Sequence, residues 1–381
     1  MDKKNTEKKR EWRKGLFAFL RPAIRLVARV FFGASTEVYR EVKGPYLVIG
    51  NHTCVADAML VCVAFREPLH IVASAATMNK GAAGRLLRAV GDPILIKKTA
   101  MDLQAIRRML GEAKAGHSIA LFPEGTITID GSPSPVDISV AKLAKQLKLP
   151  IALYRIEGGY FRKPKWAKHQ RRNRVYGKLV EMIPAEEAAT MPIEELYARI
   201  MAVVGYNPYE QPFDIPTPPA KRMAEGAERL LYYCPKCIGK GDFVPKGNTF
   251  RCSNCGAEYT IDEQCRFDAG PKNTSDWNKW QTRLAEERAD KEDFAVEGAL
   301  WDILQNTVVE TGTLAATAEG VTMGGRTIAY AQIDGVALYG HNQILLTADG
   351  VDYRFVPTAE SANVITLIAA IRHRKEKKSR G

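Results

Sequence analysis

The sequence has no long hydrophobic run. Among its 381 residues, no uninterrupted apolar stretch approaches the ~18 to 20 residues that a membrane-spanning helix requires, so we expect no transmembrane segment. No secretory signal is recognisable, and the seven cysteines are an odd number. These features argue against a disulfide framework and favour a reducing compartment.

Acidic residues are in deficit. The chain carries 43 Asp and Glu against 55 Lys and Arg, which gives a formal charge of +12. This surplus favours a polyanionic partner, either nucleic acid or an anionic lipid surface. The hydrophobic share of 46% and the charged share of 26% are ordinary for a globular protein, and the length allows two or three domains.

Basic residues concentrate in residues 1–33, which hold ten Lys or Arg against three acids. Arg21, Arg25 and Arg29 recur every four residues among apolar side chains and so form one stripe of a helix. The pattern predicts a basic amphipathic helix in the membrane interface, with its arginines toward anionic headgroups. Pro22 predicts a kink or a restart of this helix. A helix that covers the core of the next domain is the alternative, and one helix can do both.

Apolar runs alternate with helical patterns between residues 45 and 155. The expected strands are 46–50, 69–73, 94–96, 118–122 and 149–154, with helices near 55–65, 80–90, 101–114 and 137–147. Such alternation predicts an α/β fold with a largely parallel sheet flanked by helices. In such a sheet the turns after the strands converge on one crevice, so functional groups belong at the strand ends.

The first strand end carries a histidine and an aspartate. Asn51-His52-Thr53-Cys54-Val55-Ala56-Asp57 joins the strand at 46–50 to the next helix, with Thr53 as the expected N-cap. If His52 lies in the loop and Asp57 in the first helical turn, the carboxylate can hold one imidazole nitrogen and raise the basicity of the other. A general base needs this arrangement. An ordinary loop histidine beside an ordinary first-turn acid is the alternative.

A second motif closes a later strand. Leu121-Phe122-Pro123-Glu124-Gly125-Thr126 places an acid, a glycine and a hydroxyl at the end of the run 118–122. The His-x4-Asp turn, followed about 70 residues later by this Phe-Pro-Glu-Gly-Thr turn, resembles the glycerophospholipid acyltransferase family, whose best-known members are the lysophosphatidic acid acyltransferases. Two fainter family blocks have counterparts at 91–98 and 149–154. The resemblance covers roughly residues 34 to 205.

The resemblance implies a reaction. His52, oriented by Asp57, would remove the proton from the free hydroxyl of a lysophospholipid as that hydroxyl attacks a fatty-acyl thioester, without a covalent acyl-enzyme. The donor would be acyl-CoA or an acyl-carrier protein. The first choice of acceptor is 1-acyl-glycerol-3-phosphate, which would give phosphatidic acid. The acceptor-binding residues that the resemblance implies are Glu124, Gly125 and Thr126, with Lys97 or Lys98 as the basic partner.

The chain departs from the family pattern at two places. Cys54 stands where the family often has Ser, and Ile127 and Ile129 stand where it commonly has arginines. Isoleucine offers a phosphate no hydrogen bond. Acylation of another lysolipid or hydroxylated acceptor is therefore an alternative, and so is a non-catalytic protein that binds a membrane or a partner.

Four later cysteines form a metal-binding pattern. Cys234, Cys237, Cys252 and Cys255 make two Cys-x2-Cys knuckles with 14 residues between them, which predicts a structural zinc ribbon. Iron is the lesser alternative. A protein partner is compatible with such a ribbon, whereas nucleic acid is not expected, because the ribbon lacks a dense basic flank of its own.

Two further basic segments and a β-rich region complete the chain. Residues 162–174 hold seven cations, no acid and Trp166, which predicts an exposed loop at a membrane interface. Residues 297–357 show short β-type runs punctuated by glycine, and a helix near 359–374 closes them, as in a pleckstrin-homology-like fold. The tail 372–380 adds six cations against one acid, as a solvated terminus or a second lipid contact.

The expected domains are an interface helix at 1–33, an acyltransferase domain at 34–210, a linker at 211–230, a zinc ribbon at 231–262, a helical connector at 263–292, and a β-rich domain with a basic tail at 293–381. Together with the basic segments, this organisation predicts a peripheral protein on the cytoplasmic face of a membrane.

Overall fold

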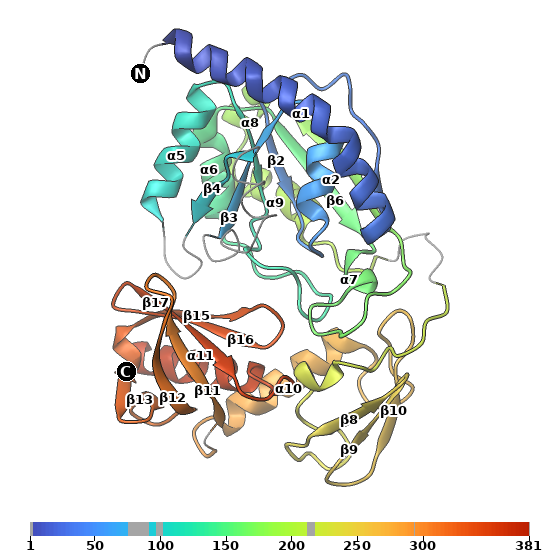
Figure 1. The fold of residues 1–381 in the computed structure, drawn as a ribbon, viewed down its shortest axis with the longest axis vertical. Coiled ribbons are helices and arrows are strands. Elements are labelled where there is room, and N and C mark those ends of the chain that lie inside the picture. Colours follow the sequence, from blue (N-terminus) through green and yellow to red (C-terminus); the bar gives the residue numbers. More distant parts are fainter. Residues whose placement is uncertain (1–2, 75–90, 97–101, 212–217, 293, 381) are drawn as a thin grey trace. The chain divides into compact units, whose positions relative to one another are not determined.

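A computed structural model describes residues 3–74, 91–96, 102–211, 218–292 and 294–380 (Figure 1). By their internal contacts these residues divide into two compact units. The first contains the described parts of 3–96, 102–164 and 172–211, and the second contains 165–171 with the described parts of 218–380. The expected helix at 80–90 lies outside the described residues.

The first unit is built on a seven-stranded sheet with the order β1-β7-β6-β2-β5-β3-β4. The strands are β1 (Ala34–Thr36), β2 (Leu47–Gly50), β3 (Leu69–Ser74), β4 (Ile94–Ile96), β5 (Ser118–Leu121), β6 (Ile151–Glu157) and β7 (Val175–Ile183). All neighbouring strands are parallel except β6 and β7. The α/β class with a largely parallel sheet is therefore confirmed.

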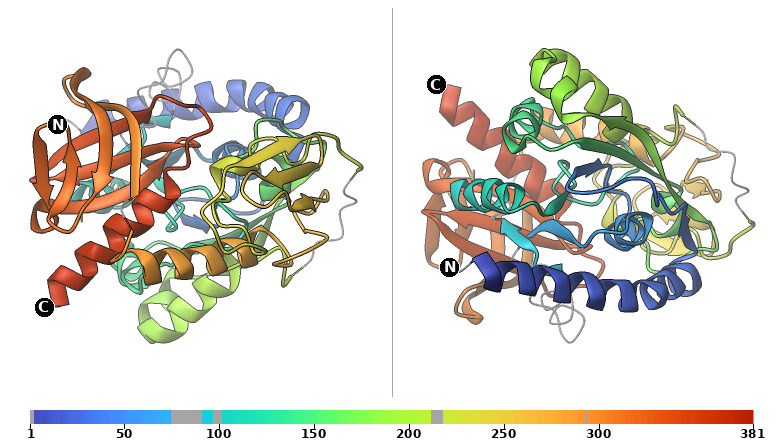
Figure 2. Two further views of the ribbon diagram at one scale, coloured as in Figure 1. Left: turned by 90° about the horizontal axis from the view of Figure 1, so that it is seen from below. Right: turned by 90° about the horizontal axis from the view of Figure 1, so that it is seen from above.

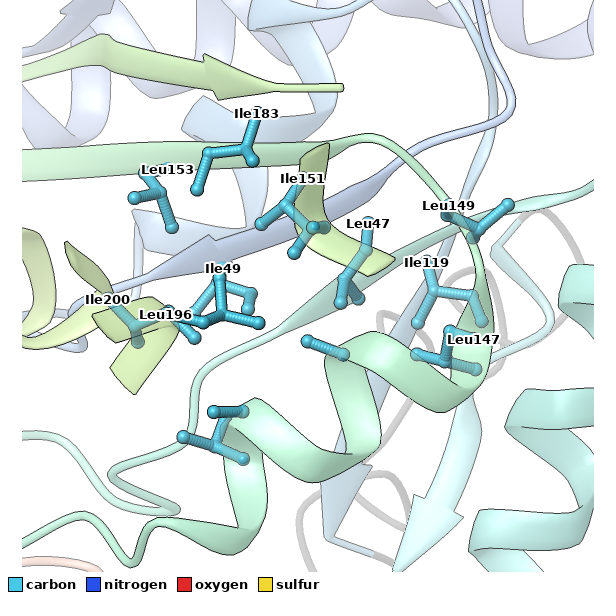
Figure 3. Close-up of a cluster of buried hydrophobic side chains, with 14 of the residues drawn as sticks. Leu47, Ile49, Ile119, Leu147, Leu149, Ile151, Leu153, Ile183, Leu196 and Ile200 are labelled. Carbon is cyan, nitrogen blue, oxygen red and sulfur yellow. The ribbon is translucent and has the colours of Figure 1, made fainter. Parts of the chain in front are cut away.

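Helices cover both faces of this sheet. The helices are α1 (Lys3–Phe32), α2 (Asp57–Ala64), α5 (Leu103–Lys114), α6 (Ser139–Leu147), the short α7 (Gly159–Arg162), α8 (Ala185–Thr190) and α9 (Ile193–Val204). Residues of α5, α6, α8 and α9 share one apolar cluster with β2, β5 and β6, and residues of α1 and α2 share another with the opposite face. Figure 3 shows the first cluster, where Ile49 of β2 lies beside Leu196 and Ile200 of α9.

Helix α1 runs without interruption through Pro22 and lies on the same side of the sheet as α2 (Figure 2, right). The guanidinium of Arg21 donates to the carbonyl oxygen of Val63, at 3.2 Å from Nε and 2.8 Å from Nη2. The prediction that Arg21 belongs to a lipid-facing stripe is therefore wrong, because this cation binds a carbonyl in the last turn of α2, where a positive charge is favourable. Arg25 and Arg29 are exposed, as expected.

The cysteine-rich part of the second unit is a three-stranded antiparallel sheet with an aromatic core. Its strands are β8 (Phe243–Lys246), β9 (Thr249–Cys252) and β10 (Glu258–Thr260), in the order β10-β9-β8, and α10 (Thr274–Arg288) packs against them. Trp277 of α10 is fully buried and contacts the rings of Phe243, Phe250, Tyr259 and Phe267. The expected connector helix thus supplies the core of the ribbon.

The segment 165–171 belongs to this second unit, although it lies between α7 and β7 in the sequence. Trp166 is 1% exposed, and Arg171 stacks on its ring while donating to the carbonyl oxygen of Met223 and to Sγ of Cys265. The main-chain N–H of Lys168 donates to the carbonyl oxygen of Glu225. The prediction of a tryptophan exposed at a membrane interface is therefore wrong, because Trp166 is buried inside the second unit under Arg171.

The last part of the chain is a seven-stranded, fully antiparallel sheet with the order β14-β13-β12-β11-β17-β16-β15. The strands are β11 (Phe294–Asp302), β12 (Thr307–Ala316), β13 (Gly320–Met323), β14 (Arg326–Ala329), β15 (Ile333–Tyr339), β16 (Gln343–Ala348) and β17 (Val351–Pro357), and α11 (Ile365–Arg380) follows. A β-rich region closed by a C-terminal helix is confirmed, while the pleckstrin-homology-like fold stays a prediction.

The basic tail is the second half of α11 and is partly built into the fold. Arg374 is buried, and its Nε donates to the carbonyl oxygen of Ala289 at 2.8 Å. Nη2 of Arg372 donates to the carbonyl oxygen of Val336 at 3.0 Å. Arg374 is thus not part of a solvated terminus, whereas Arg372 is hydrogen-bonded to the fold but exposed.

Candidate active site

The histidine and the glutamate of the two motifs leave the same edge of the sheet. His52 follows β2, Asp57 is the first residue of α2, and Glu124 follows β5. Because β2 and β5 are neighbouring parallel strands, both loops start at their carboxyl ends. The structure therefore brings together residues that are far apart in the sequence.

His52 and Asp57 form a hydrogen-bonded pair, with 2.8 Å between Nδ1 and Oδ2. Asp57 is fully buried, and its Oδ2 also accepts the main-chain N–H of Thr53 at 2.5 Å and that of Cys54 at 2.9 Å. Three donors on one oxygen fix the orientation of this carboxylate. Sγ of Cys54 lies 3.1 Å from Oδ1 and makes the contact that a serine hydroxyl could make in its place.

The N-cap of α2 is Ala56, so the prediction of Thr53 in this position is wrong. The hydroxyl of Thr53 instead donates to Oδ1 of Asp57 at 3.2 Å. The physical reason is that the helix begins at Asp57, so Thr53 lies three residues before the N-cap and its hydroxyl binds the acid instead.

The imidazole of His52 is held in one tautomer. Since Asp57 accepts from Nδ1–H, the proton is on Nδ1 and Nε2 carries a lone pair. The ring stacks on Phe122, with centroids 4.9 Å apart, and the side chain of His52 is 24% exposed. Nε2 is thus the nitrogen that can accept a proton from a reacting group.

Glu124 links the two loops. Its Oε1 accepts the main-chain N–H of His52 at 2.7 Å, and its Oε2 accepts that of Ser134 at 2.9 Å. Burial raises the pKa of Glu124 to about 7, even though these two hydrogen bonds favour the ionised form. Glu124 therefore positions the histidine loop, a role that the sequence pattern did not indicate.

The other expected acceptor-binding residues are less constrained. Gly125 is exposed and has a φ of +67°, a left-handed conformation that glycine adopts without strain, and its N–H donates to the carbonyl oxygen of Phe122. Thr126 is half-buried in the same turn. Lys97 and Lys98 lie outside the described residues.

Two positioning residues were not found by sequence reasoning. The side chain of Asn51 donates from Nδ2 to the carbonyl oxygen of Ile156 at 2.8 Å and accepts the N–H of Ile156 on Oδ1 at 2.7 Å, so it extends the ladder with β6 past the end of β2. At Gly159 a Cβ would lie 2.1 Å from the hydroxyl oxygen of Thr53, so only glycine allows α7 to approach the histidine loop. The signals were an amide directly after a buried strand and the Gly158-Gly159 pair after another.

The four ribbon cysteines converge. Their sulfur atoms all lie within 4.8 Å of one another, with 3.7 Å between Cys234 and Cys255 and 4.0 Å between Cys237 and Cys252. Four thiolates around zinc at 2.3 Å are about 3.8 Å apart in a tetrahedron. The donor set therefore fits a structural metal ion with no open position.

Comparisons with known proteins bear on the first unit. Residues 29–156 match the family model described as Acyltransferase. A search of curated protein sequences found no match. Among solved structures, the chain is similar to the crystal structure of the 1-acyl-sn-glycerophosphate (LPA) acyltransferase PlsC from Thermotoga maritima, at 19% sequence identity and a TM-score of 0.43, over 52% of this chain and 79% of that chain.

Proposed function

We propose that this chain, which carries a domain of the acyltransferase family at residues 29–156, moves a fatty acyl chain from an acyl thioester to the free hydroxyl of a lysophospholipid. The observation that carries the proposal is the pair of His52 and Asp57, in which a buried carboxylate holds Nδ1 and leaves Nε2 as the basic nitrogen. The first choice of acceptor is 1-acyl-glycerol-3-phosphate, as the ordered pair of motifs implies.

The reaction needs one proton acceptor that later becomes a proton donor. Nε2 of His52 takes the proton of the acceptor hydroxyl while the hydroxyl oxygen forms a bond to the carbonyl carbon of the thioester. When the tetrahedral intermediate collapses, the carbon–sulfur bond breaks, and the imidazolium returns the proton to the departing thiolate. Asp57 stabilises the imidazolium between these two steps, so no covalent acyl-enzyme is required.

The remaining motif residues have proposed roles in acceptor binding. Gly125 and Thr126 leave the same sheet edge as His52 and would contact the glycerol phosphate, with Lys97 or Lys98 as the cation. Glu124 would act mainly through the loops, because its two oxygen atoms accept main-chain N–H groups.

The experiment is a product analysis. The purified chain is incubated with acyl-CoA or acyl-carrier protein and a panel of lysolipids, and the diacyl products are identified by mass spectrometry. We expect phosphatidic acid from 1-acyl-glycerol-3-phosphate, and loss of this product in His52→Ala. Near-normal turnover by His52→Ala would overturn the mechanism. Absence of every product with every donor would favour the non-catalytic alternative.

We further propose that the enzyme works as a peripheral protein on the cytoplasmic face of the membrane. Helix α1 exposes a row of large apolar side chains at Trp12, Phe19, Leu26 and Val30, spaced by seven, seven and four residues along one face. The exposed Arg25 lies on the same helix. This exposed apolar row supports a contact of α1 with the membrane surface. No helix in the described part of the chain is long and apolar enough to cross a bilayer.

A further inference from the structure

A second cluster of metal-ligand side chains lies in the first unit, at the sheet edge opposite the histidine loop. His70 is the second residue of β3, His117 directly precedes β5, and Glu112 is in the last turn of α5. Because β3 and β5 are parallel, both histidines lie at the amino ends of their strands. The proposed acyl-transfer chemistry uses none of these three residues.

The three side chains present their ligand atoms to one another. Nδ1 of His117 lies 2.7 Å from Oε2 of Glu112, and Nε2 of His70 lies 3.6 Å from the same oxygen. The two imidazole rings are 5.1 Å apart, and all three ligand atoms lie within 4.8 Å of one another. Zinc ligands at about 2.0–2.2 Å in a tetrahedron are about 3.3–3.6 Å apart. The distance from His70 to Glu112 already matches this spacing, and the distance from His117 to Glu112 would have to lengthen when a metal binds.

Neighbouring groups orient His70 and Glu112 toward the cluster. Nδ1–H of the buried His70 donates to the carbonyl oxygen of Asp92 at 2.9 Å, which places the lone pair on Nε2. Arg108 lies 3.7 Å from Oε1 of Glu112, and Oε2 faces the histidines.

The cluster borders a small cavity of about 20 Å³, which His70 and His117 line. This volume holds about one water molecule. The ion pair of Lys14 and Glu67, 3.3 Å apart, also lines the cavity, and Glu67 offsets the charge of the lysine there. The cavity therefore has room for one water molecule beside the two imidazoles.

We propose that His70, Glu112 and His117 form a second metal site, which takes zinc with a water molecule as the fourth ligand. Two imidazoles and one carboxylate are donors that zinc prefers, and the donor set differs from the thiolates of the ribbon. Its position gives it a structural role, because one ion would join α5 to the starts of β3 and β5. The competing arrangement is an ion-pair cluster in which both imidazoles share the carboxylate without a metal.

The test is the zinc content of the full chain, measured by plasma mass spectrometry after equilibration with zinc and removal of excess metal. We expect two ions per chain in the natural sequence and one in His117→Gln, since the ribbon keeps its own ion. His169→Gln is the matched control, because His169 also pairs with a glutamate, Glu225 at 2.8 Å, but is absent from the cluster of three ligands. It should keep two.

Cobalt supplies a readout that does not depend on the variants. The second cobalt ion bound by the natural chain should add visible bands without a thiolate charge-transfer band, because its ligands are nitrogen and oxygen. A natural chain that saturates at one metal ion, or a folded His117→Gln that keeps two, would overturn the proposal. If His117→Gln does not fold, His70→Gln replaces it and should also bind one ion, while the natural chain should still bind two.

Discussion

The main-chain N–H of His52 donates a 2.7 Å hydrogen bond to Oε1 of Glu124, so the proposed base is fastened directly to the acid of the second motif. Through Ser134 the same carboxylate also holds the loop after β5. A substitution of Glu124 therefore moves His52 as well as any acceptor contact. A loss of activity at Glu124 consequently does not by itself show that this residue binds the acceptor.

Asp57→Asn should slow the reaction more than it weakens acceptor binding. An amide cannot stabilise the imidazolium and can hold the wrong tautomer, so we expect kcat to fall by roughly 10²–10⁴-fold with little change in the KM of the acceptor. Steady-state kinetics check this. Asp130→Asn is the control, because this buried acid accepts from Ser132 in the loop after β5. Equal loss of kcat and acceptor affinity would assign Asp57 a structural role.

Glu124 should make the stability of the fold depend on pH. Its pKa is about 7 in the folded chain and about 4.5 in the unfolded chain. Between these values the folded state binds more protons, so this group lowers the free energy of unfolding as the pH rises. Glu124→Gln cannot titrate and should lack that decline. Denaturant unfolding of both proteins from about pH 5 to about pH 8 measures the difference, and a constant difference across the range would contradict the prediction.

Cys237→Ser should remove one zinc ion per chain and unfold the ribbon, because metal binding supplies the folding energy of so small a unit. We expect acyl transfer to remain largely intact. Metal analysis, near-ultraviolet circular dichroism and product analysis test the three statements. Cys62→Ser is the control, since Cys62 is on α2 and is not part of the metal-binding cluster. Failure to find a ribbon ion in the natural chain would end this assignment.

Phe19→Glu should weaken binding to vesicles that contain an anionic lipid. Phe19 is 80% exposed on α1, and a carboxylate there both removes apolar area and repels the headgroups. Added salt should weaken binding of the natural chain as well. Leu304→Glu changes an apolar residue that is 95% exposed between β11 and β12, and it serves as the control. Unchanged sedimentation of Phe19→Glu with vesicles would leave α1 with only its packing role.

Ile127→Arg should shift acceptor preference toward lysophosphatidic acid. Arginine can bind a phosphate through two parallel hydrogen bonds, whereas isoleucine desolvates the charge. Competition between lysophosphatidic acid and a lysolipid with a larger head group measures the shift. A folded variant with unchanged preference would show that Ile127 does not select the acceptor, and the alternative of a neutral acceptor would then need other support.

The sequence predicted the sheet because each buried parallel strand is a continuous apolar run, as in β2 and β5, and turns follow at once. It also predicted that His52 and Asp57 would meet, because their spacing allows contact only across a loop and a first helical turn. The hydrogen bonds of Asn51 and Glu124 were not predictable. They join these side chains to main-chain groups of Ile156 and His52, which lie 105 and 72 residues away in the sequence. Main-chain groups leave no signal in the side-chain pattern.

The errors have a common physical cause. Arg21, Arg171 and Arg374 were assigned to solvent or lipid from the local density of charge, yet each donates to a main-chain carbonyl inside the protein. An arginine side chain reaches far enough for its partner to depend on the tertiary fold, and its long aliphatic part packs against apolar groups. Composition along the chain does not contain that information.

The inclusion of residues 165–171 in the second unit limits how the chain can be divided. The carbonyl oxygen of Trp166 accepts from Arg229, and a Cβ on Gly226 would lie 2.3 Å from that oxygen, so this segment and residues 226–229 are shaped to each other. A chain that ends at residue 211 would expose Trp166, because the missing part normally buries it. A chain that begins at residue 218 would lack Trp166. No single cut in the chain therefore separates the two units into intact folding modules.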